Sequence, residues 1–383
     1  MNVERLLPTP EASALLELVG DLADREIRPR IDGYEDEHRF PRDVLHTLGE
    51  AGLLGLPYPE DVGGGGQPYE VYLQVVEELA RAWLTVGLSV SVQTLSCFPV
   101  AMYGSAEQRE RLLPEMLAGG VLGAYCLSEP SSGSDAAALR ARAVRDGDVY
   151  VVDGTKAWIT HAGHADFYAV MVRTDENAGS HGISCLLVPA DTEGLSAAAP
   201  EQKMGLRTSP TAQVHLDGAR VPVRNRVGEE GQGFAIALSA LDAGRLGIAA
   251  CAVGVAQAAL DTAVSYAKER RQFGRPIAEF EGVGFMLADM AAGIEAARAL
   301  YLHAARRKDA GLPFTREAAM AKLVASDTAM RVTTDAVQVL GGYGYVRDFP
   351  VERYMREAKV LQIVEGTNQI QRLVISRRLV KSG

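Results

Sequence analysis

A single carboxylate, that of Glu365, stands in an apolar run near the C-terminus and is followed directly by Gly366. Because Thr367 can cap a new helix, the pattern predicts a short non-helical turn between two helices, with Glu365 aimed into the space beside them. Apolar surroundings disfavour the charged carboxylate and raise its pKa towards the range useful to a general base. A glutamate that simply ends a helix and faces water is the alternative interpretation of this turn.

Two earlier stretches carry groups that could bind a flat ligand with a polar edge. Tyr125–Asp135 reads YCLSEPSSGSD, and Lys156–Thr160 reads KAWIT. The indole of Trp158 could cover an isoalloxazine face, while Ser128 and Thr160 could form hydrogen bonds with the polar edge of the ring. An ordinary turn and a buried core tryptophan are the alternative interpretations.

A third stretch, Gln338–Gly344, reads QVLGGYG and contains three glycines. Glycines present backbone amides without side-chain bulk. Because such amides suit the close approach of a cofactor, this stretch is a third candidate binding segment.

The elements that must position these groups change in type along the chain. Apolar residues at helical spacing predict helices over Glu11–Arg28, Pro41–Gly52, Pro68–Trp83, Leu84–Met102 and Glu107–Leu117. Pro29 is expected to stop the first helix.

Short β-rich runs then predict strands over Arg140–Arg145, Val149–Asp153, Phe167–Val172, Ile183–Val188 and Ala212–Leu216, the first two joined as a hairpin at Asp146-Gly147. This spacing is typical of a sandwich or a small barrel.

Helical patterns return from Gly231, and three prolines divide them into four helices: Pro276, Pro313 and Pro350. The second helix carries a heptad seam that is either an internal core or a subunit interface, formed by Phe280, Val283, Leu287, Met290, Ile294, Ala297, Tyr301 and Ala304. The predicted fold class is therefore α+β. It has an N-terminal helical domain over residues 1–120, a middle β-barrel or sandwich domain over 121–230, and a C-terminal four-helix bundle over 231–383.

Composition narrows the class of protein. The 383 residues are 47% hydrophobic and 23% charged, which is ordinary for a globular protein, and the formal net charge of -10 argues against a nucleic-acid partner. The four cysteines are widely scattered, without CxxC spacing or His partners, so no metal site is predicted: Cys97, Cys126, Cys185 and Cys251. They are expected to be reduced, buried thiols. The first residues open no long apolar run, and no later stretch is expected to span a bilayer, so no membrane association is predicted. The chain is expected to be cytoplasmic, although a mature organellar matrix protein would look the same.

Five motifs together carry a resemblance: SEPxxGSD, WIT, ERRQFG, QVLGG and VEGTNQIQ. In this order and spacing, over essentially the whole chain, they resemble the acyl-CoA dehydrogenase family. The resemblance implies bound FAD, a homotetramer, and α,β-dehydrogenation of an acyl-CoA thioester, with electrons passed to an electron-transfer flavoprotein. The chain is most similar to the short-chain and short branched-chain members.

The resemblance also implies roles for individual residues. Glu365 would take the α-proton while a β-hydride passes to flavin N5, and its backbone N–H would bind the thioester carbonyl together with a flavin ribityl hydroxyl. The implied FAD contacts are Tyr125, Leu127, Ser128, Ser134, Trp158, Ile159, Thr160, Arg270, Phe273, Gln338, Gly341, Gly342, Thr367 and Gln369, with Arg270 reaching phosphates of an FAD bound mainly by a neighbouring subunit. The implied substrate contacts are Ser134, Asp242, Arg245, Val364 and Gly366.

One position bears on the choice of base, and two positions depart from the usual pattern of the family. Gly244 occupies the place where some relatives carry the base, which leaves Glu365 as the only candidate. Glu281 stands where many members have Gln at a cofactor contact. Val364 replaces a frequent Tyr and would free space beside the reacting carbons, so acyl groups of about four or five carbons, with a methyl branch tolerated, are expected to be preferred in a graded way.

Two other functions remain open from the residues. A flavin oxidase or mono-oxygenase could use the same fold, although members that diverged in this way usually lose the base that Glu365 provides. A non-catalytic flavin-binding or purely structural helical oligomer is the third hypothesis, and the intact base and flavin motifs argue against it.

Overall fold

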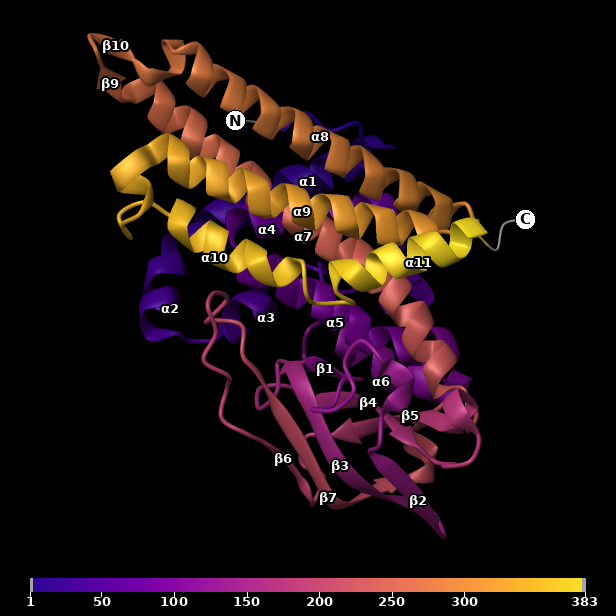
Figure 1. Ribbon diagram of the computed structural model, residues 1–383. Coiled ribbons are helices and arrows are strands. Elements are labelled where there is room, and N and C mark those ends of the chain that lie inside the picture. The colour runs from indigo at the N-terminus through magenta and orange to yellow at the C-terminus, as the bar shows by residue number, and fades with distance from the viewer. Residues whose placement is uncertain (1–2, 381–383) are drawn as a thin grey trace.

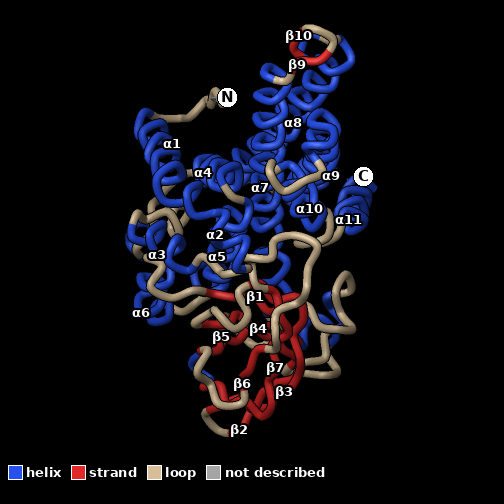
Figure 2. The backbone as a smooth tube through the Cα atoms, turned by 90° about the vertical axis from the view of Figure 1, so that its left-hand side faces the viewer, coloured by secondary structure: helices blue, strands red, loops and turns tan. Residues whose placement is uncertain are grey.

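The computed structural model describes residues 3–380, with helices from both ends of the chain lying on one side of a sheet (Figures 1 and 2). The first third forms α1 (Pro10–Leu22), α2 (Ile31–Glu37), α3 (Arg42–Glu50), α4 (Tyr69–Ala82), α5 (Leu84–Tyr103) and α6 (Ala106–Leu117). All five helices predicted for this part are present. Helix α6 begins with a capping box, in which the side chains of Ser105 and Gln108 each accept the other's main-chain N–H.

The helical chain does not stop at Pro29, so that expectation was wrong. Helix α1 gives way to a π turn over Ala23–Ile27 and a 3₁₀ turn over Arg28–Arg30, and α2 follows at once. Proline has no N–H and interrupts the hydrogen-bond ladder. Its fixed φ nevertheless suits the first turn of a helix, so a new helical turn starts at Arg28 and the chain does not leave the helical region.

The middle of the chain forms one eight-stranded sheet. Its strands are β1 (Gly123–Cys126), β2 (Arg142–Asp146), β3 (Val149–Thr160), β4 (Phe167–Arg173), β5 (Ile183–Pro189), β6 (Leu195–Ala197), β7 (Thr211–Pro222) and β8 (Arg226–Val227), in the order β6-β7-β3-β2-β4-β5-β8 with β1 beside β4. All five predicted strands are present, and β2 and β3 form the predicted hairpin. Strands β2 and β4 meet at a single residue pair, so the sheet folds into two halves that enclose a common core, as the prediction of a sandwich or barrel requires.

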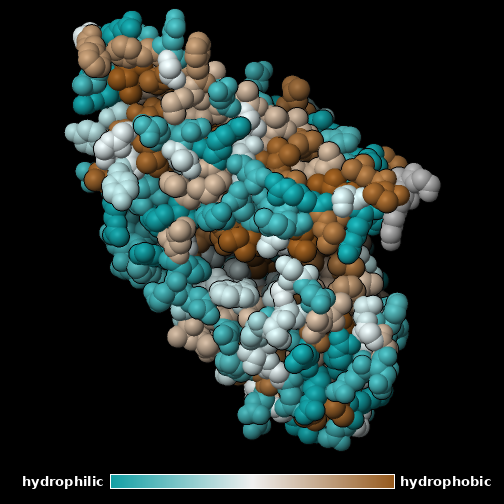
Figure 3. Space-filling model, viewed as in Figure 1, coloured by the Kyte–Doolittle hydropathy of each residue, from teal (hydrophilic) through white to brown (hydrophobic). Residues whose placement is uncertain are grey.

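Helices cover the outer face of β4 and β5. Residues of this face, such as Met171 and Cys185, pack against Val100 of α5, Leu113 of α6 and Ile236 of the next helix, α7 (Gly233–Glu269). All four cysteines are free and buried, as predicted. Between the helical layer and the sheet, the surface is hollowed and lined by apolar atoms (Figure 3).

The C-terminal part consists of α7 (Gly233–Glu269), α8 (Glu281–Asp309), α9 (Thr315–Leu340), α10 (Val351–Leu361) and α11 (Asn368–Val380). The three prolines fall between helices as predicted, but the last expected helix is two helices, because the turn around Glu365 separates α10 from α11. A small hairpin, β9 (Arg271–Gln272) and β10 (Arg275–Pro276), links α7 to α8. Most of the heptad seam is core, since Met290, Ile294, Ala297, Tyr301 and Ala304 are buried against the other helices. The proposed domain bounds stay a prediction.

Within residues 3–380, two helices are long and apolar enough to cross a membrane by length and composition, so the expectation that no stretch would meet this test was wrong. They are α5, and α7 over its most apolar part. Their apolar windows are 89% and 78% buried inside the protein, so the hydropathy of both helices is used in packing. The cytoplasmic location stays a prediction.

Candidate active site

The turn between α10 and α11 holds Glu365 in a left-handed conformation, with φ +54°, and Gly366 follows at φ +87°. Gln371 of α11 ties this turn down, because its Nε2 donates to the carbonyl oxygens of Glu365 at 3.1 Å and of Gly366 at 2.7 Å. A Cβ on Gly366 would stand 2.9 Å from the same Nε2. Glycine is therefore required here both by the backbone conformation and by space.

Thr367 accepts a hydrogen bond from Ile370 N–H at 3.3 Å and caps α11, as predicted. The chain leaves α10 through Ile363 and Val364, whose main-chain N–H groups both donate to Val360 O. The prediction of a short non-helical turn between two helices is confirmed. The alternative, a helix end whose carboxylate faces water, is wrong.

The Glu365 carboxylate is buried at its tip. The residue as a whole is half-buried, but Oε2 is inaccessible to water and accepts no hydrogen bond from residues 3–380. Burial raises the pKa of Glu365 to about 7, and the positive charges of Arg245 and Lys322 oppose that rise. A carboxylate with these properties can accept a proton near neutral pH.

Helix α7 passes directly beside this carboxylate. Arg245 is buried and pairs through Nη1 with Asp242 Oδ1, whereas its Nε has no partner within the described part of the chain. Thr315 Oγ1 donates to the second oxygen of Asp242 at 2.6 Å. Burial raises the pKa of Asp242, although the Arg245 charge opposes this. Two of the five residues predicted to contact substrate, Asp242 and Arg245, therefore form one ion pair, and the arginine keeps a donor without a partner in residues 3–380.

A wall of the sheet region presents Trp158. One extra residue in β3, opposite β7, forms a bulge between Lys156 and Ile159, and Trp158 takes φ +63° within it. The side chain is 65% exposed, so the alternative of a buried core tryptophan is wrong. A left-handed conformation costs energy for a bulky residue and is retained where the surrounding structure demands it. Here it turns a large flat ring out of the sheet, where a planar ligand could cover it.

The Ser128 segment is joined to this bulge. Ala157 N–H donates to Ser128 O at 2.9 Å. The side chain of the fully buried Lys156 makes a second connection between the two stretches, because it donates to Glu129 Oε1 at 2.8 Å and to Leu127 O at 3.2 Å. The structure thus joins SEPxxGSD directly to WIT. The side chains of Leu127 and Ile159 are buried in the protein core, so any contact they make with a ligand would come mainly from the main chain.

Tyr125 of β1 connects this wall to the base. Its hydroxyl is buried and has no hydrogen-bond partner in residues 3–380. Burial raises its pKa well above the usual range, and the nearby Glu365 charge adds to the effect. The hydroxyl is a polar atom without a partner close to the base, as expected where a polar ligand supplies the missing contact.

The remaining predicted cofactor residues lie elsewhere in the chain. Arg270, Gly341 and Gly342 line a shallow pocket of about 580 Å³ at the end of the bundle farthest from the sheet, near β9 and β10 (Figure 1). The Arg270 guanidinium stands 5.8 Å from the centre of the Tyr343 ring, and Phe273 on the hairpin is 94% exposed. Within one chain, β9 and β10 lie at the opposite end of the molecule from β3, the strand that contains Trp158 (Figure 1).

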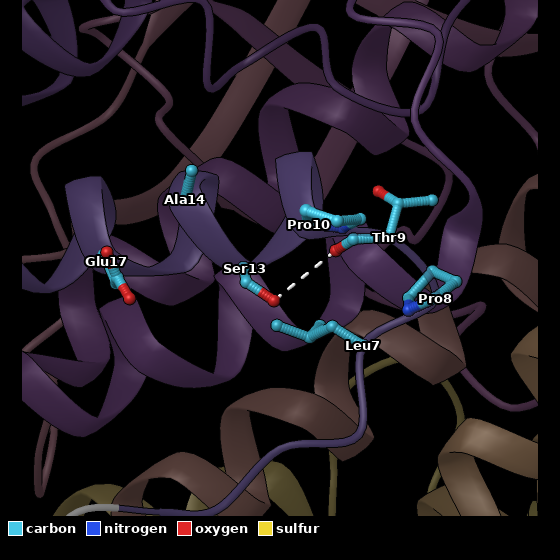
Figure 4. A pocket seen from close by; sticks show the side chains of 7 residues that line it. All are labelled: Leu7, Pro8, Thr9, Pro10, Ser13, Ala14 and Glu17. Atoms are coloured by element: carbon cyan, nitrogen blue, oxygen red, sulfur yellow. Dashed lines mark hydrogen bonds between the residues drawn. The ribbon is translucent and has the colours of Figure 1, made fainter.

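The other predicted residues take varied positions. Gln338 is in the last turn of α9, and its carbonyl accepts the Gly341 N–H. Ser134 and Gln369 are exposed, and Glu281 is the first residue of α8. A further pocket of about 520 Å³ at the start of α1 contains no cluster of ionisable groups; its lining is drawn in Figure 4.

Sequence reasoning missed Lys322 of α9. This lysine is fully buried, and its Nζ donates to Gly366 O at 3.0 Å and to Asn368 Oδ1 at 2.8 Å. In the sequence, Lys322 stands in the alanine-rich stretch EAAMAKLVAS, where the pattern predicts a helix and gives no sign that the charged group is buried. Only the fold shows that it lies beneath the turn of Glu365.

Family models match three consecutive parts of the chain. The N-terminal domain of acyl-CoA dehydrogenases matches residues 9–120, the middle domain matches 124–219, and the C-terminal domain matches 231–380. A short-chain specific acyl-CoA dehydrogenase of Clostridium acetobutylicum is 42% identical over 374 residues, which cover 97% of this chain and 99% of the relative.

Solved structures agree with these matches. The butyryl-CoA dehydrogenase of Megasphaera elsdenii superposes with a TM-score of 0.96 at 40% identity, covering 98% of this chain and 100% of the other. A chain from work on the electron transferring flavoprotein of Acidaminococcus fermentans and flavin-based electron bifurcation superposes with a TM-score of 0.97 at 43% identity, covering 99% and 100%. The chain therefore belongs to the acyl-CoA dehydrogenase family and is a flavin-dependent oxidoreductase.

Proposed function

We propose that this enzyme converts a short-chain acyl-CoA to the 2-enoyl-CoA, with Glu365 as the base that takes the α-proton. The observation that carries the proposal is the Glu365 carboxylate, whose Oε2 is buried without a partner in the described residues and whose pKa is raised to about 7. An α-C–H bond of a thioester is a poor acid. A base with a near-neutral pKa in a pocket that excludes water suits its removal.

The main chain of Glu365 supplies the second part of the chemistry. Its N–H donates to no acceptor within residues 3–380, so it is free to bind the thioester carbonyl oxygen. A donor at that oxygen stabilises the enolate character that develops as the α-proton leaves. Base and donor belong to one residue, and Gln371 fixes both by holding the carbonyls of the turn.

FAD is the proposed cofactor, and the residues present fit it. Trp158 exposes a flat ring at a strained position, and the Tyr125 hydroxyl is buried without a partner in the described chain. On the sheet side, FAD would be held by Tyr125, Leu127, Ser128, Ser134, Trp158, Ile159 and Thr160; a neighbouring subunit would add Arg270, Phe273, Gln338, Gly341, Gly342, Thr367 and Gln369. When bound, FAD supplies the acceptor for the β-hydride.

The proposed substrate contacts include the ion pair of α7 and the two chain neighbours of the base. Arg245 keeps its Nε free and, through Asp242, is anchored to α9. Val364 and Gly366 flank the base and would border the acyl group, and Ser134 would contact the CoA portion. The short-chain and butyryl-CoA names of the relatives support a small acyl group.

A homotetramer is the proposed assembly, and an electron-transfer flavoprotein is the proposed electron acceptor. The separation of the Arg270 pocket from Trp158 within one chain supports a cofactor site shared between copies. The nearly full exposure of Phe273 next to that pocket supports the same arrangement. The similarity to a chain studied with the electron transferring flavoprotein of Acidaminococcus fermentans supports the choice of acceptor.

A comparison of three substrates tests the preference for short acyl groups. We expect kcat/KM to be higher for butyryl-CoA and isobutyryl-CoA than for octanoyl-CoA. Because Tyr is larger than Val, Val364→Tyr should lower the kcat/KM for isobutyryl-CoA relative to that for butyryl-CoA. The corresponding change in activation free energy should not exceed the ~1–3 kcal/mol that one methyl group contributes in an apolar pocket. A preference for octanoyl-CoA would contradict the proposal, and an unchanged ratio in the variant would remove Val364 from it. Rapid oxygen consumption by the substrate-reduced enzyme would point to an oxidase instead.

A further inference from the structure

A buried cation lies beneath the turn that carries Glu365. Lys322 projects from α9 with its side chain fully buried, and its ammonium donates to Gly366 O at 3.0 Å and to Asn368 Oδ1 at 2.8 Å. Gly366 O thus accepts hydrogen bonds from two side chains, Lys322 and Gln371. A buried lysine is costly unless its charge is compensated, so this placement calls for an explanation.

The neighbours of Lys322 on α9 hold the two ends of the same turn. Asn368, the first residue of α11, donates through Nδ2 to Ser326 Oγ at 3.0 Å and to Asp327 Oδ1 at 2.7 Å. Gln362, at the end of α10, donates to the same Asp327 oxygen at 2.6 Å. One face of α9 therefore fixes the chain before and after Glu365, and Lys322 fixes its middle.

The charge of Lys322 also acts on the carboxylate. Lys322 is one of two cations that oppose the rise in the Glu365 pKa, and the other is Arg245 of α7. Burial lowers the Lys322 pKa to about 8, while Glu365 and Asp327 favour its charged form and Arg245 disfavours it. The ionisable groups facing Glu365 from the other packed elements are the phenols of Tyr69 on α4 and Tyr125 on β1.

We propose that Lys322 is a positioning residue for the Glu365 base: its ammonium holds the left-handed turn in place and provides the buried positive charge that keeps the carboxylate ionised beside the substrate. This inference rests on the proposed role of Glu365. The alternative is that Lys322 only stabilises the helix packing. A packing role predicts a loss of stability but no effect on the protonation of Glu365.

Exchange of the α-hydrogens of acetyl-CoA with D2O separates these roles. Acetyl-CoA has α-hydrogens and no β-carbon, so exchange reports proton removal and return by the base without hydride transfer. The rate is followed by NMR between pH 5.5 and 8 on the flavin-loaded enzyme, together with flavin content and the thermal unfolding midpoint. The exchange rate should rise with pH, because only ionised Glu365 can take the proton.

Three variants divide the contributions of charge and hydrogen bonding. Lys322→Met removes both. We expect the pH range over which the exchange rate rises, called here the limb, to move up by about one pH unit, because loss of a nearby cation raises the pKa of the Glu365 carboxyl group. We also expect the plateau, which is the exchange rate above this pH range, to fall at least about tenfold, because the turn that carries Glu365 is no longer held in place. Lys322→Gln keeps an N–H donor and should fold even where the Met variant does not, with the same shift of the limb. Lys322→Arg keeps the charge and should leave the limb in place while lowering the plateau.

Lys203→Met is the matched control. Lys203 is half-buried, burial likewise lowers its pKa to about 8, and its Nζ also donates to one main-chain carbonyl, Ser209 O, and one side-chain oxygen, Thr211 Oγ1. It belongs to the loop before β7, so its loss should reduce stability and leave the exchange limb unchanged.

The inference is overturned if the Met and Gln variants keep the wild-type limb, or if Arg shifts the limb as far as Met does. Glu365→Gln distinguishes failure of the inference about Lys322 from failure of the proposed function. If it abolishes exchange, the base assignment stands whatever Lys322 does. If it retains exchange, the proposed function fails, independently of the lysine variants.

Discussion

Gly244 of α7 and the carboxylate of Glu365 occupy adjacent space: a Cβ on Gly244 would stand 2.9 Å from Glu365 Oε2 and 3.3 Å from Leu95 Cδ1. A contact of 2.9 Å is closer than a Cβ and an oxygen tolerate, so a side chain at position 244 would displace the tip of the Glu365 carboxylate. Glycine at position 244 thus leaves the Glu365 carboxylate free to occupy its present position.

Gly244→Ala is therefore expected to displace the Glu365 carboxylate. We expect kcat to fall at least about tenfold, because small misplacements of a catalytic group are costly, while flavin content is unchanged. Gly20→Ala in α1 is the control, since nothing lies within 4 Å of its added Cβ. The control should keep full activity and gain up to ~1 kcal/mol of stability from its better helix propensity. Wild-type kcat in the Gly244 variant would contradict the steric account.

Trp158 should report FAD binding through its fluorescence. The chain has only two tryptophans; Trp83 is buried, whereas Trp158 is 65% exposed. Addition of FAD to the apoprotein should quench the long-wavelength emission of Trp158 as a flavin covers its ring. Trp158→Phe should lose most of this change and Trp83→Phe should keep it. Equal quenching in both variants would show that Trp158 does not lie at the flavin.

Arg270→Ala tests the shared cofactor site. If the guanidinium binds phosphate oxygens of FAD held by a neighbouring subunit, its loss should produce partly apo protein and an assembly that weakens when FAD is removed. Flavin absorbance and analytical ultracentrifugation measure the two effects. Arg271→Ala on the adjacent, exposed position is the control and should change neither. Full flavin content with an unchanged oligomer in the Arg270 variant would refute the sharing.

Glu357 of α10 should make stability depend on pH. Its carboxyl oxygens accept no hydrogen bond from residues 3–380, and Arg353 Nε stands 3.8 Å from Oε1. Burial raises the pKa of Glu357 from 4.5 to about 8, and Arg353 opposes the rise. The folded state therefore retains a proton that the unfolded state releases; this contribution is complete below pH 4.5 and is lost as pH rises through about 8.

Glu357→Gln should remove that pH dependence, because an amide stays neutral. The stability of the variant relative to wild type should rise with pH between 5 and 8, by up to about 1.4 kcal/mol per pH unit. Denaturant unfolding of both proteins at several pH values measures the difference. A difference independent of pH would show that Glu357 is ionised in the folded protein.

The sequence was most informative where local pattern decides the structure. The apolar run, the glycine and the threonine around Glu365 predicted the turn and the helix cap, because caps and left-handed glycines are local features. The five helices of the first third followed from spacing for the same reason. Strand β1 was not predicted, since its four residues include glycine and gain their hydrogen bonds from β4, more than forty positions later.

Features set by distant contacts could not be predicted. The left-handed Trp158 arises from a bulge opposite β7, some fifty residues on, against the ordinary preference of a bulky side chain. The buried Lys322 acquires its role from Gly366 and Asn368, which reach it only in the folded chain. In both cases the residue contradicts its local propensity near the candidate active site, where such exceptions concentrate.

The most direct test of the central claim is anaerobic reduction of the enzyme-bound flavin by butyryl-CoA in wild type and in Glu365→Gln. The amide keeps the shape of the side chain but accepts no proton, so FAD content and thioester binding should be retained. We predict that wild type loses its flavin absorbance rapidly and that the variant does so at least ~10²–10⁴-fold more slowly. Reduction of the Gln variant at a rate near that of wild type would contradict the assignment of Glu365 as the base.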